Sequence, residues 1–328
     1  MRTWTPRLPT PRGVARHLGP RDSPRRSLHP KDHRVSGDDY LLDNQQTQAG
    51  ERFDALAALF NPTTFRHMDA IGLTAGWRVW EVGAGGPSVP AWIAARTGGP
   101  VLATDIDTVW LSDMDESVDV VRHDVGVVLA PDGQFDLVHA RLVLVHVTNR
   151  ERSLATMVEA LAPGGWLLLE EADPGLQRLV CPDEVGDAER LANRLKHGFR
   201  TLMAKCGVDL AFSRMLPRLL RSVGLDEVES DAYFPMGSPT CTELERATIE
   251  QIRDQLIEHG LATPEEIERH LNSVTAGALG LATPPMVSVW DVRRLDGPVH
   301  ASRQPTTKRG DSRVVPIGTE RRRSLERL

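Results

Sequence analysis

Residues 77–97 constrain the fold more than any other stretch of this 328-residue chain. A short apolar run ends in Glu81, a turn follows that contains Gly83, Gly85 and Gly86, and an Ala-rich, helix-like segment comes next. A strand, a glycine turn and a helix in this order form the first ligand-binding crevice of an open α/β sheet. Glycine lets the backbone approach a ligand closely, and the new helix presents free N–H groups to it. The stretch predicts a ligand site and leaves the ligand open.

Strand-like and helix-like segments alternate after this turn. Short apolar runs that predict strands lie at 78–82, 101–104, 118–121, 135–139, 166–171, 225–234 and 286–290. Strands that alternate with helices over about a hundred residues indicate a parallel sheet covered on both faces.

The two ends of the chain differ from its middle. Residues 1–34 and 296–328 are rich in Arg and lack an apolar period, so the net charge of −6 reflects an acidic body between basic tails. We expect 1–34 to be a disordered basic N-terminal extension and 296–328 a loose basic C-terminal tail. Residues 35–295 are expected to form the folded domain.

The body contains more predicted helices than are needed to cover the two faces of the sheet. We expect helical insertions at about 39–72, 174–223 and 242–279 to form a cap over the sheet. Within the first of these, Asn61-Pro62 predicts a break between two helices.

Composition limits the location of the protein. No apolar run approaches the ~18–20 residues of a membrane span, and the N-terminus lacks the apolar region of a secretory signal. Cys181, Cys206 and Cys241 are far apart and form no CxxC pattern, so they indicate neither a zinc site nor a disulfide framework. These features predict a cytoplasmic protein without a metal.

An acid ends each of the next two predicted strands. Asp105 stands twenty residues after Gly85, where a carboxylate can bind two ribose hydroxyls, and Asp124 is placed to accept from an adenine amino group. The dinucleotide pattern GxGxxG would need a third glycine at Ser88. The acids therefore favour an adenosine ligand other than a dinucleotide.

A further motif, Leu161-Ala162-Pro163-Gly164-Gly165, precedes the predicted strand at 166–171. With the glycine turn and the two strand-end acids, it resembles the pattern of the class I S-adenosylmethionine-dependent methyltransferases, especially the small-molecule bacterial branch. The resemblance covers about residues 40–294. It implies a Rossmann-like, doubly wound α/β fold with a mostly parallel seven-stranded sheet, an antiparallel last strand and a helical cap. Pro87 departs from the family pattern, which has a third glycine there, and it removes one N–H donor.

The resemblance also implies roles for individual residues. The glycine loop would lie against the methionine part of S-adenosyl-L-methionine and would be ordered by Glu81, while the two strand-end acids would bind ribose and adenine. Arg141, after the fourth strand, would flank the methionine part and the acceptor. The implied cofactor-binding residues are Glu81, Gly83, Gly85, Gly86, Asp105, Ile106, Asp124, Val125 and Arg141.

No catalytic group stands out in the sequence. His146, His139 and Arg141 are weak candidates, because a histidine can act as a general base. Methyl transfer depends above all on alignment, which can supply ~7–11 kcal/mol of the barrier, so a dedicated base is not required. Trp110 is a candidate for stacking near adenine, and Tyr40 and His67 are candidates for reaching a ligand, with ordinary packing the alternative for all three.

The sequence thus predicts a methyltransferase that moves a methyl group from S-adenosyl-L-methionine to an O, N or C atom of a small organic molecule. The acidic body argues against a nucleic-acid partner, and no membrane partner is expected. Two alternatives stay open: a non-catalytic regulator that binds the same cofactor, and a nucleotide-dependent oxidoreductase, against which Ser88 and Asp124 count. The sequence leaves the acceptor and the oligomeric state undetermined.

Overall fold

The computed structural model describes residues 41, 42, 44 and 46–294. The described residues all fall within one compact unit, Asp39–Leu328. The expectations for residues 1–34, for residues 296–328 and for Tyr40 lie outside the described residues.

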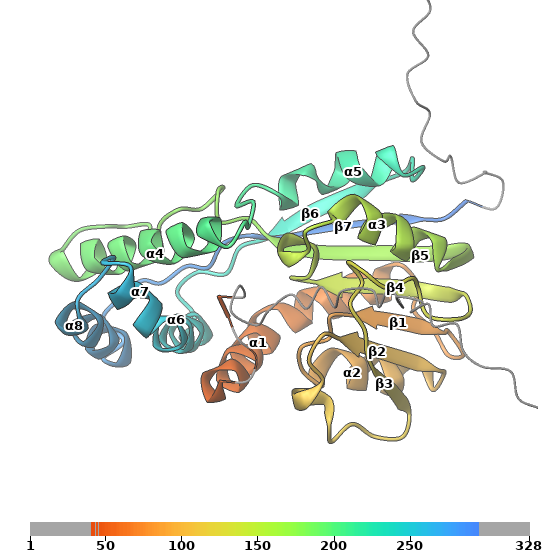
Figure 1. The fold of residues 1–328 in the computed structure, drawn as a ribbon, viewed down its shortest axis with the longest axis horizontal. Helices are drawn as coiled ribbons and strands as arrows, with labels where there is room; N and C mark the ends of the chain where they lie inside the picture. The colour runs from red at the N-terminus through yellow and green to blue at the C-terminus, as the bar shows by residue number, and fades with distance from the viewer. Residues whose placement is uncertain (1–40, 43, 45, 295–328) are drawn as a thin grey trace, which may run out of the picture. The chain divides into compact units, whose positions relative to one another are not determined.

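A seven-stranded sheet forms the centre of this unit (Figure 1). Its order is β3-β2-β1-β4-β5-β7-β6, and β7 runs antiparallel to both of its neighbours while the other six strands are parallel. The predicted Rossmann-like, doubly wound sheet with an antiparallel last strand is therefore confirmed. The strands are β1 (Val79–Val82), β2 (Val101–Asp105), β3 (Val118–Arg122), β4 (Phe135–Arg141), β5 (Leu161–Ala172), β6 (Glu229–Tyr233) and β7 (Met286–Val292).

The strand order reverses at β1. From β1 the chain moves outward to β2 and β3, and then returns to place β4 on the other side of β1. In open α/β sheets the ligand crevice lies outside the carboxyl ends of the strands at such a switch point. The topology therefore places the candidate site at the ends of β1, β2 and β4.

Helices cover both faces of the sheet. On one face, α2 (Ser88–Thr97) and the end of α1 (Thr47–Ala70) bury apolar side chains against β1, β4 and β5. On the other, α3 (Arg150–Glu159) and α5 (Leu216–Ser222) pack over the same strands. Alternate strand residues face opposite sides, which is why the strands are nearly continuously apolar.

A second group of helices lies beyond the carboxyl ends of the strands, at the left of Figure 1. It contains α4 (Asp187–Lys205), α6 (Pro239–Gln251), α7 (Arg253–Glu258) and α8 (Pro264–Thr275). α1 runs along α6, so it connects this group to the sheet. α5, which also lies within 174–223, packs on the sheet instead. Three short 3₁₀ turns complete the described elements: η2 (Val109–Leu111), η3 (Leu144–His146) and η4 (Ser213–Met215).

The predicted break at Asn61-Pro62 is wrong, because α1 is one continuous helix with Pro62 inside it. Proline removes one backbone hydrogen bond and usually kinks or ends a helix. Here both sides of the proline are buried: Phe60 packs in a cluster with α6, and Met68 packs against the sheet. Tertiary packing on both halves outweighs the local cost.

Among the helices of the described part, none is long and apolar enough to cross a lipid bilayer.

Leu168 tests the contribution of the sheet core. It is fully buried on β5, so Leu168→Ala should lower the free energy of unfolding by about 2–5 kcal/mol through lost burial and a residual cavity. Leu129→Ala is the matched control, because Leu129 is 70% exposed and its truncation should change stability by less than about 0.5 kcal/mol. Urea denaturation measures both; equal effects would contradict the assigned core.

Candidate functional site

The glycine turn between β1 and α2 needs glycine for steric reasons. Gly83 and Gly85 have φ angles of +62° and +63°, in the left-handed region that side chains rarely adopt. A Cβ on Gly83 would overlap the side chain of Val143, and one on Gly85 would press on the ring of Phe53 at 3.0 Å. The protein's own side chains therefore enclose the turn from two sides.

Asp105, the acid at the end of β2, binds this turn directly. Its Oδ2 accepts a hydrogen bond from the Gly85 amide at 2.9 Å, and its Oδ1 accepts from the Asp107 amide at 3.0 Å. Burial raises the pKa of the Asp105 carboxyl above its ordinary value, although the backbone hydrogen bonds oppose this. Each carboxylate oxygen has two lone pairs, so acceptor capacity remains for a ligand hydroxyl. Ile106, beside it, is 51% exposed.

The side chain of Glu81 pairs with a residue of the neighbouring strand. Its Oε2 lies 2.6 Å from Nδ1 of His139 on the adjacent strand β4, and both side chains are buried. The acid that the structure shows on an amide of the glycine turn is Asp105. Glu81 stabilises the base of the turn through β4.

The Glu81–His139 pair begins a buried row of acids and histidines across the sheet. Nε2 of His139 lies 3.4 Å from Oε2 of Glu170 on β5, and Oε1 of Glu170 lies 3.2 Å from Nδ1 of His67 on α1. Nε2 of His67 then lies 3.1 Å from Asp231 on β6. We call Glu81, His139, Glu170, His67 and Asp231 the acid–histidine row.

Within this row, neighbouring charged groups favour the charged forms of His139 and Glu170. Burial lowers the pKa of His139, but the facing carboxylates of Glu81 and Glu170 outweigh it and raise that pKa to about 9. For Glu170, burial raises the pKa, but the hydrogen bonds from His139 and His67 and the charges of His139 and Arg141 outweigh it and hold that pKa well below its usual range. Thr64 and Ser288 also donate to Glu170.

His139 and His67 therefore have structural roles, because both are buried and paired with carboxylates. His139 has no exposed surface and lies between two carboxylates, and His67 is 4% exposed. Neither side chain is placed to take a proton from a substrate in solution.

Arg141, at the end of β4, connects the sheet to α1. Its Nη1 donates to Oδ1 of Asn61 at 2.9 Å and to Oγ1 of Thr64 at 3.1 Å. The next residue, Leu142, has φ +59°, and among the described residues it is the one non-glycine with a positive φ. Such strain persists where the surrounding structure imposes it, and it is concentrated at functional sites.

His146 ends η3, five residues after the end of β4. It is partly exposed, and burial together with the nearby cations Arg52 and Arg150 lowers its pKa to about 4. Its imidazole is therefore neutral at pH 7.

The predicted adenine-binding segment follows β3. Oδ1 of Asp124 accepts from the Gly126 amide at 2.8 Å, which closes a local turn, and the side chain is partly exposed. Val125 is buried in the core beneath α3, so only its backbone is placed to serve a ligand.

Trp110, in η2, packs on the first turns of α1. Its Nε1 donates to the carbonyl of Asn44 at 2.6 Å, its ring fills the space beside Gly50, and it meets Phe53 edge-on at 6.4 Å between ring centroids. The ring of Phe53 in turn contacts Gly85. The start of α1 thus lies against the glycine turn, a contact that sequence periodicity did not indicate.

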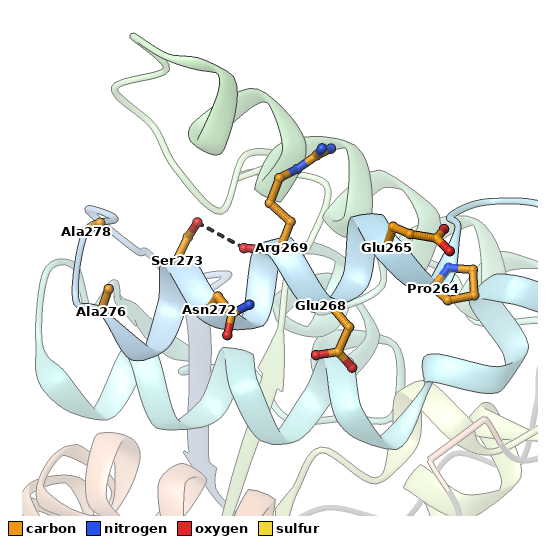
Figure 2. Close-up of a pocket in the computed structure, with 8 residues that line it drawn as sticks. All are labelled: Pro264, Glu265, Glu268, Arg269, Asn272, Ser273, Ala276 and Ala278. Carbon is orange, nitrogen blue, oxygen red and sulfur yellow. Dashed lines mark hydrogen bonds between the residues drawn. The ribbon is translucent and has the colours of Figure 1, made fainter.

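A hollow on the outer side of α8 is a separate feature (Figure 2). Its walls come from α8 and from Ala276 and Ala278, which follow it. Ser273 donates to the Arg269 carbonyl of the same helix. None of the predicted site residues lines it. The carboxyl ends of β1, β2 and β4 remain the candidate site.

Comparison with known proteins agrees with this location. Residues 80–169, which run from β1 to β5, match the family model described as "Methyltransferase domain". The part of the chain from β1 to β5 is therefore similar to a methyltransferase domain.

Two curated relatives carry methyltransferase names. Methyltransferase GfsG of Streptomyces halstedii is 25% identical over 198 residues, which cover 57% of this chain and 66% of GfsG. Methyltransferase str3 of Strobilurus tenacellus is 49% identical over 43 residues, which cover 13% of this chain and 16% of str3. Each alignment with these two proteins spans less than two thirds of the relative's length.

A solved structure shares the fold of the methyltransferase domain. It is phosphoethanolamine N-methyltransferase 2 of Haemonchus contortus in complex with S-adenosyl-L-methionine. The likeness has a TM-score of 0.50 and 16% sequence identity, and it covers 79% of this chain and 60% of that chain. At this identity the likeness concerns the fold alone.

The acid–histidine row predicts a pH dependence of folding. Because the folded pKa of His139 is about 9 against an ordinary 6.5, its charge stabilises the fold fully below about pH 6.5 and progressively less as the pH rises through 9. His139→Asn should lower stability at pH 6 and reduce its decline between pH 6.5 and 9. Urea denaturation across this range measures both; an unchanged slope in the folded variant would show that His139 is uncharged in the native protein.

Proposed function

We propose that the chain transfers a methyl group from S-adenosyl-L-methionine to an O, N or C atom of a small organic molecule. One observation carries the proposal: within the methyltransferase domain, Asp105 binds the amide of Gly85 at the switch point of the sheet. The cofactor crevice of such a fold lies at this place.

The chemistry of the described residues fits this cofactor. S-adenosyl-L-methionine carries no phosphate, and no Lys or Arg occurs from Glu81 to Ala95. The carboxylates of Asp105 and Asp124 can accept from ribose hydroxyls and from an adenine amino group, and the backbone at Val125 lies next to Asp124. The bound cofactor would supply an electrophilic methyl group on a sulfonium.

On the acceptor side, His146 is the group that we assign to the reaction. The other two candidates for a catalytic group are excluded as proton acceptors. His139 is enclosed between carboxylates, and Arg141 stays charged and cannot take a proton. In the proposed step an acceptor atom forms a bond to the methyl carbon, the carbon–sulfur bond breaks, and neutral His146 accepts the acceptor's proton.

The helices α4, α6, α7 and α8 are proposed to enclose the acceptor. They lie beyond the carboxyl ends of the strands, where a lid can exclude water from a small substrate (Figure 1). Together with the acidic body of the chain, this arrangement favours a small molecule over a nucleic acid.

Two measurements separate this proposal from its rivals. Calorimetric titration with S-adenosyl-L-methionine and with NAD should give binding of the first alone; binding of NAD alone would favour an oxidoreductase. Release of S-adenosylhomocysteine in the presence of a panel of small phenols, amines and carbonyl compounds should then identify an enzyme. Tight binding without release for any acceptor would favour a regulator.

Asp105→Ala tests the cofactor half of the site. The change removes a charged acceptor and frees the Gly85 amide, so binding of S-adenosyl-L-methionine should weaken by roughly 1–3 kcal/mol, about 5- to 150-fold in Kd. Calorimetry measures it. Asp119→Ala, at an exposed position on β3, is the control and should bind normally. Unchanged affinity in folded Asp105→Ala would refute the ribose role.

His146→Gln tests the acceptor half. Loss of a proton acceptor should lower kcat about 100-fold or more while the affinity for S-adenosyl-L-methionine changes little. His197→Gln, on the exposed side of α4, should behave as the wild type. If His146→Gln keeps full kcat, the acceptor needs no base and alignment alone carries the reaction.

A further inference from the structure

Residues 141–146, which we call the site loop, contact three parts of the molecule. Arg141 binds Asn61 and Thr64 of α1, and Val143 fills the space beside Gly83 of the glycine turn. Leu142 packs against the apolar cluster that α1, α4, α6 and α8 share. His146 ends the loop.

The backbone of the site loop is strained at Leu142. Leu142 is in the left-handed region at φ +59°, which for a non-glycine residue costs about 1–2 kcal/mol. Its amide donates to the carbonyl of Glu170 at 2.8 Å, and the next three amides all point to one acceptor.

That acceptor is Glu171 at the end of β5. Its Oε1 receives hydrogen bonds from the amides of Val143, Leu144 and Val145 at 3.1, 2.6 and 3.3 Å. The side chain is 1% exposed, and burial is the main reason why its pKa is raised to about 8. Its Oε2 is buried and without a hydrogen-bond partner within the described part of the chain.

We propose that Glu171 is a positioning residue for methyl transfer, which holds the site loop so that Val143 supports the glycine turn while His146 faces the acceptor. The inference rests on the proposed function. Three hydrogen bonds to one buried oxygen offset the strain at Leu142. Through them Glu171 positions both Val143, beside the glycine turn, and His146, at the end of the site loop. Misplacement by about 1 Å can cost about 100-fold in rate.

The length of the side chain, more than its charge, is what this role requires. Glutamine has the same length and an oxygen that can accept the three amides, and it matches the protonated carboxyl that a pKa of about 8 favours at pH 7. Aspartate keeps the carboxylate but is shorter by one carbon–carbon bond, about 1.5 Å. The two conservative variants should therefore differ.

The test compares Glu171→Gln, Glu171→Asp and Glu171→Ala, with Glu159→Gln on the exposed side of α3 as the control. Amide hydrogen exchange of a peptide that covers 143–145, in protein without any ligand, should be about tenfold faster in the Asp and Ala variants and near wild type in the Gln and control variants. Thermal melting confirms that each variant is folded. If Asp exchanges as slowly as Gln, the positioning role is overturned.

Kinetics then link the loop to the reaction. In the Asp and Ala variants we expect kcat/KM for methyl transfer to fall about 100-fold, mostly in kcat, with rescue by Gln. Faster exchange with unchanged kcat would overturn the role in catalysis. If the wild type binds no S-adenosyl-L-methionine, the proposed function fails, and the exchange data still decide whether Glu171 holds the loop.

Discussion

The structure depends on the balance of buried charge beneath α1. Five titratable side chains alternate in sign from β1 to β6, and four of them have almost no contact with water. A buried charge without a partner is strongly destabilising, whereas a paired and hydrogen-bonded one is tolerated. The same row fixes four strands and α1 relative to one another, because each histidine bridges two acids. The carboxyl edge of the sheet is thereby held rigid where the candidate site lies.

This rigidity extends to the glycine turn. The turn is held by Asp105 from β2, by Val143 from the site loop and by Phe53 from α1. A site whose backbone is already in place loses less entropy when it binds, so more of the interaction energy appears as affinity. The glycines serve two purposes here: they allow the left-handed conformation, and they leave room for these neighbouring side chains.

The fold could be predicted from the sequence because its signals are local. Apolar runs, the turn at Gly83–Gly86 and the acid at Asp105 each lie within a few residues, and they determine strand order once the family pattern is applied. The side-chain partner of Glu81 and the continuity of α1 at Pro62 could not be predicted in this way. The partner of Glu81 is His139, fifty-eight residues away, and Pro62 is accommodated by packing against helices that come much later in the chain. Long-range contacts decide both outcomes, and no local pattern encodes them.

The same distinction separates the two halves of the candidate site. Residues proposed for the cofactor lie on consecutive strand ends, so one stretch of sequence specifies them. The acceptor side that we propose consists of α1, the site loop and the helices α4, α6, α7 and α8, which are contributed by distant segments. A fold can therefore retain its cofactor chemistry while the acceptor changes, because separate segments supply the two halves.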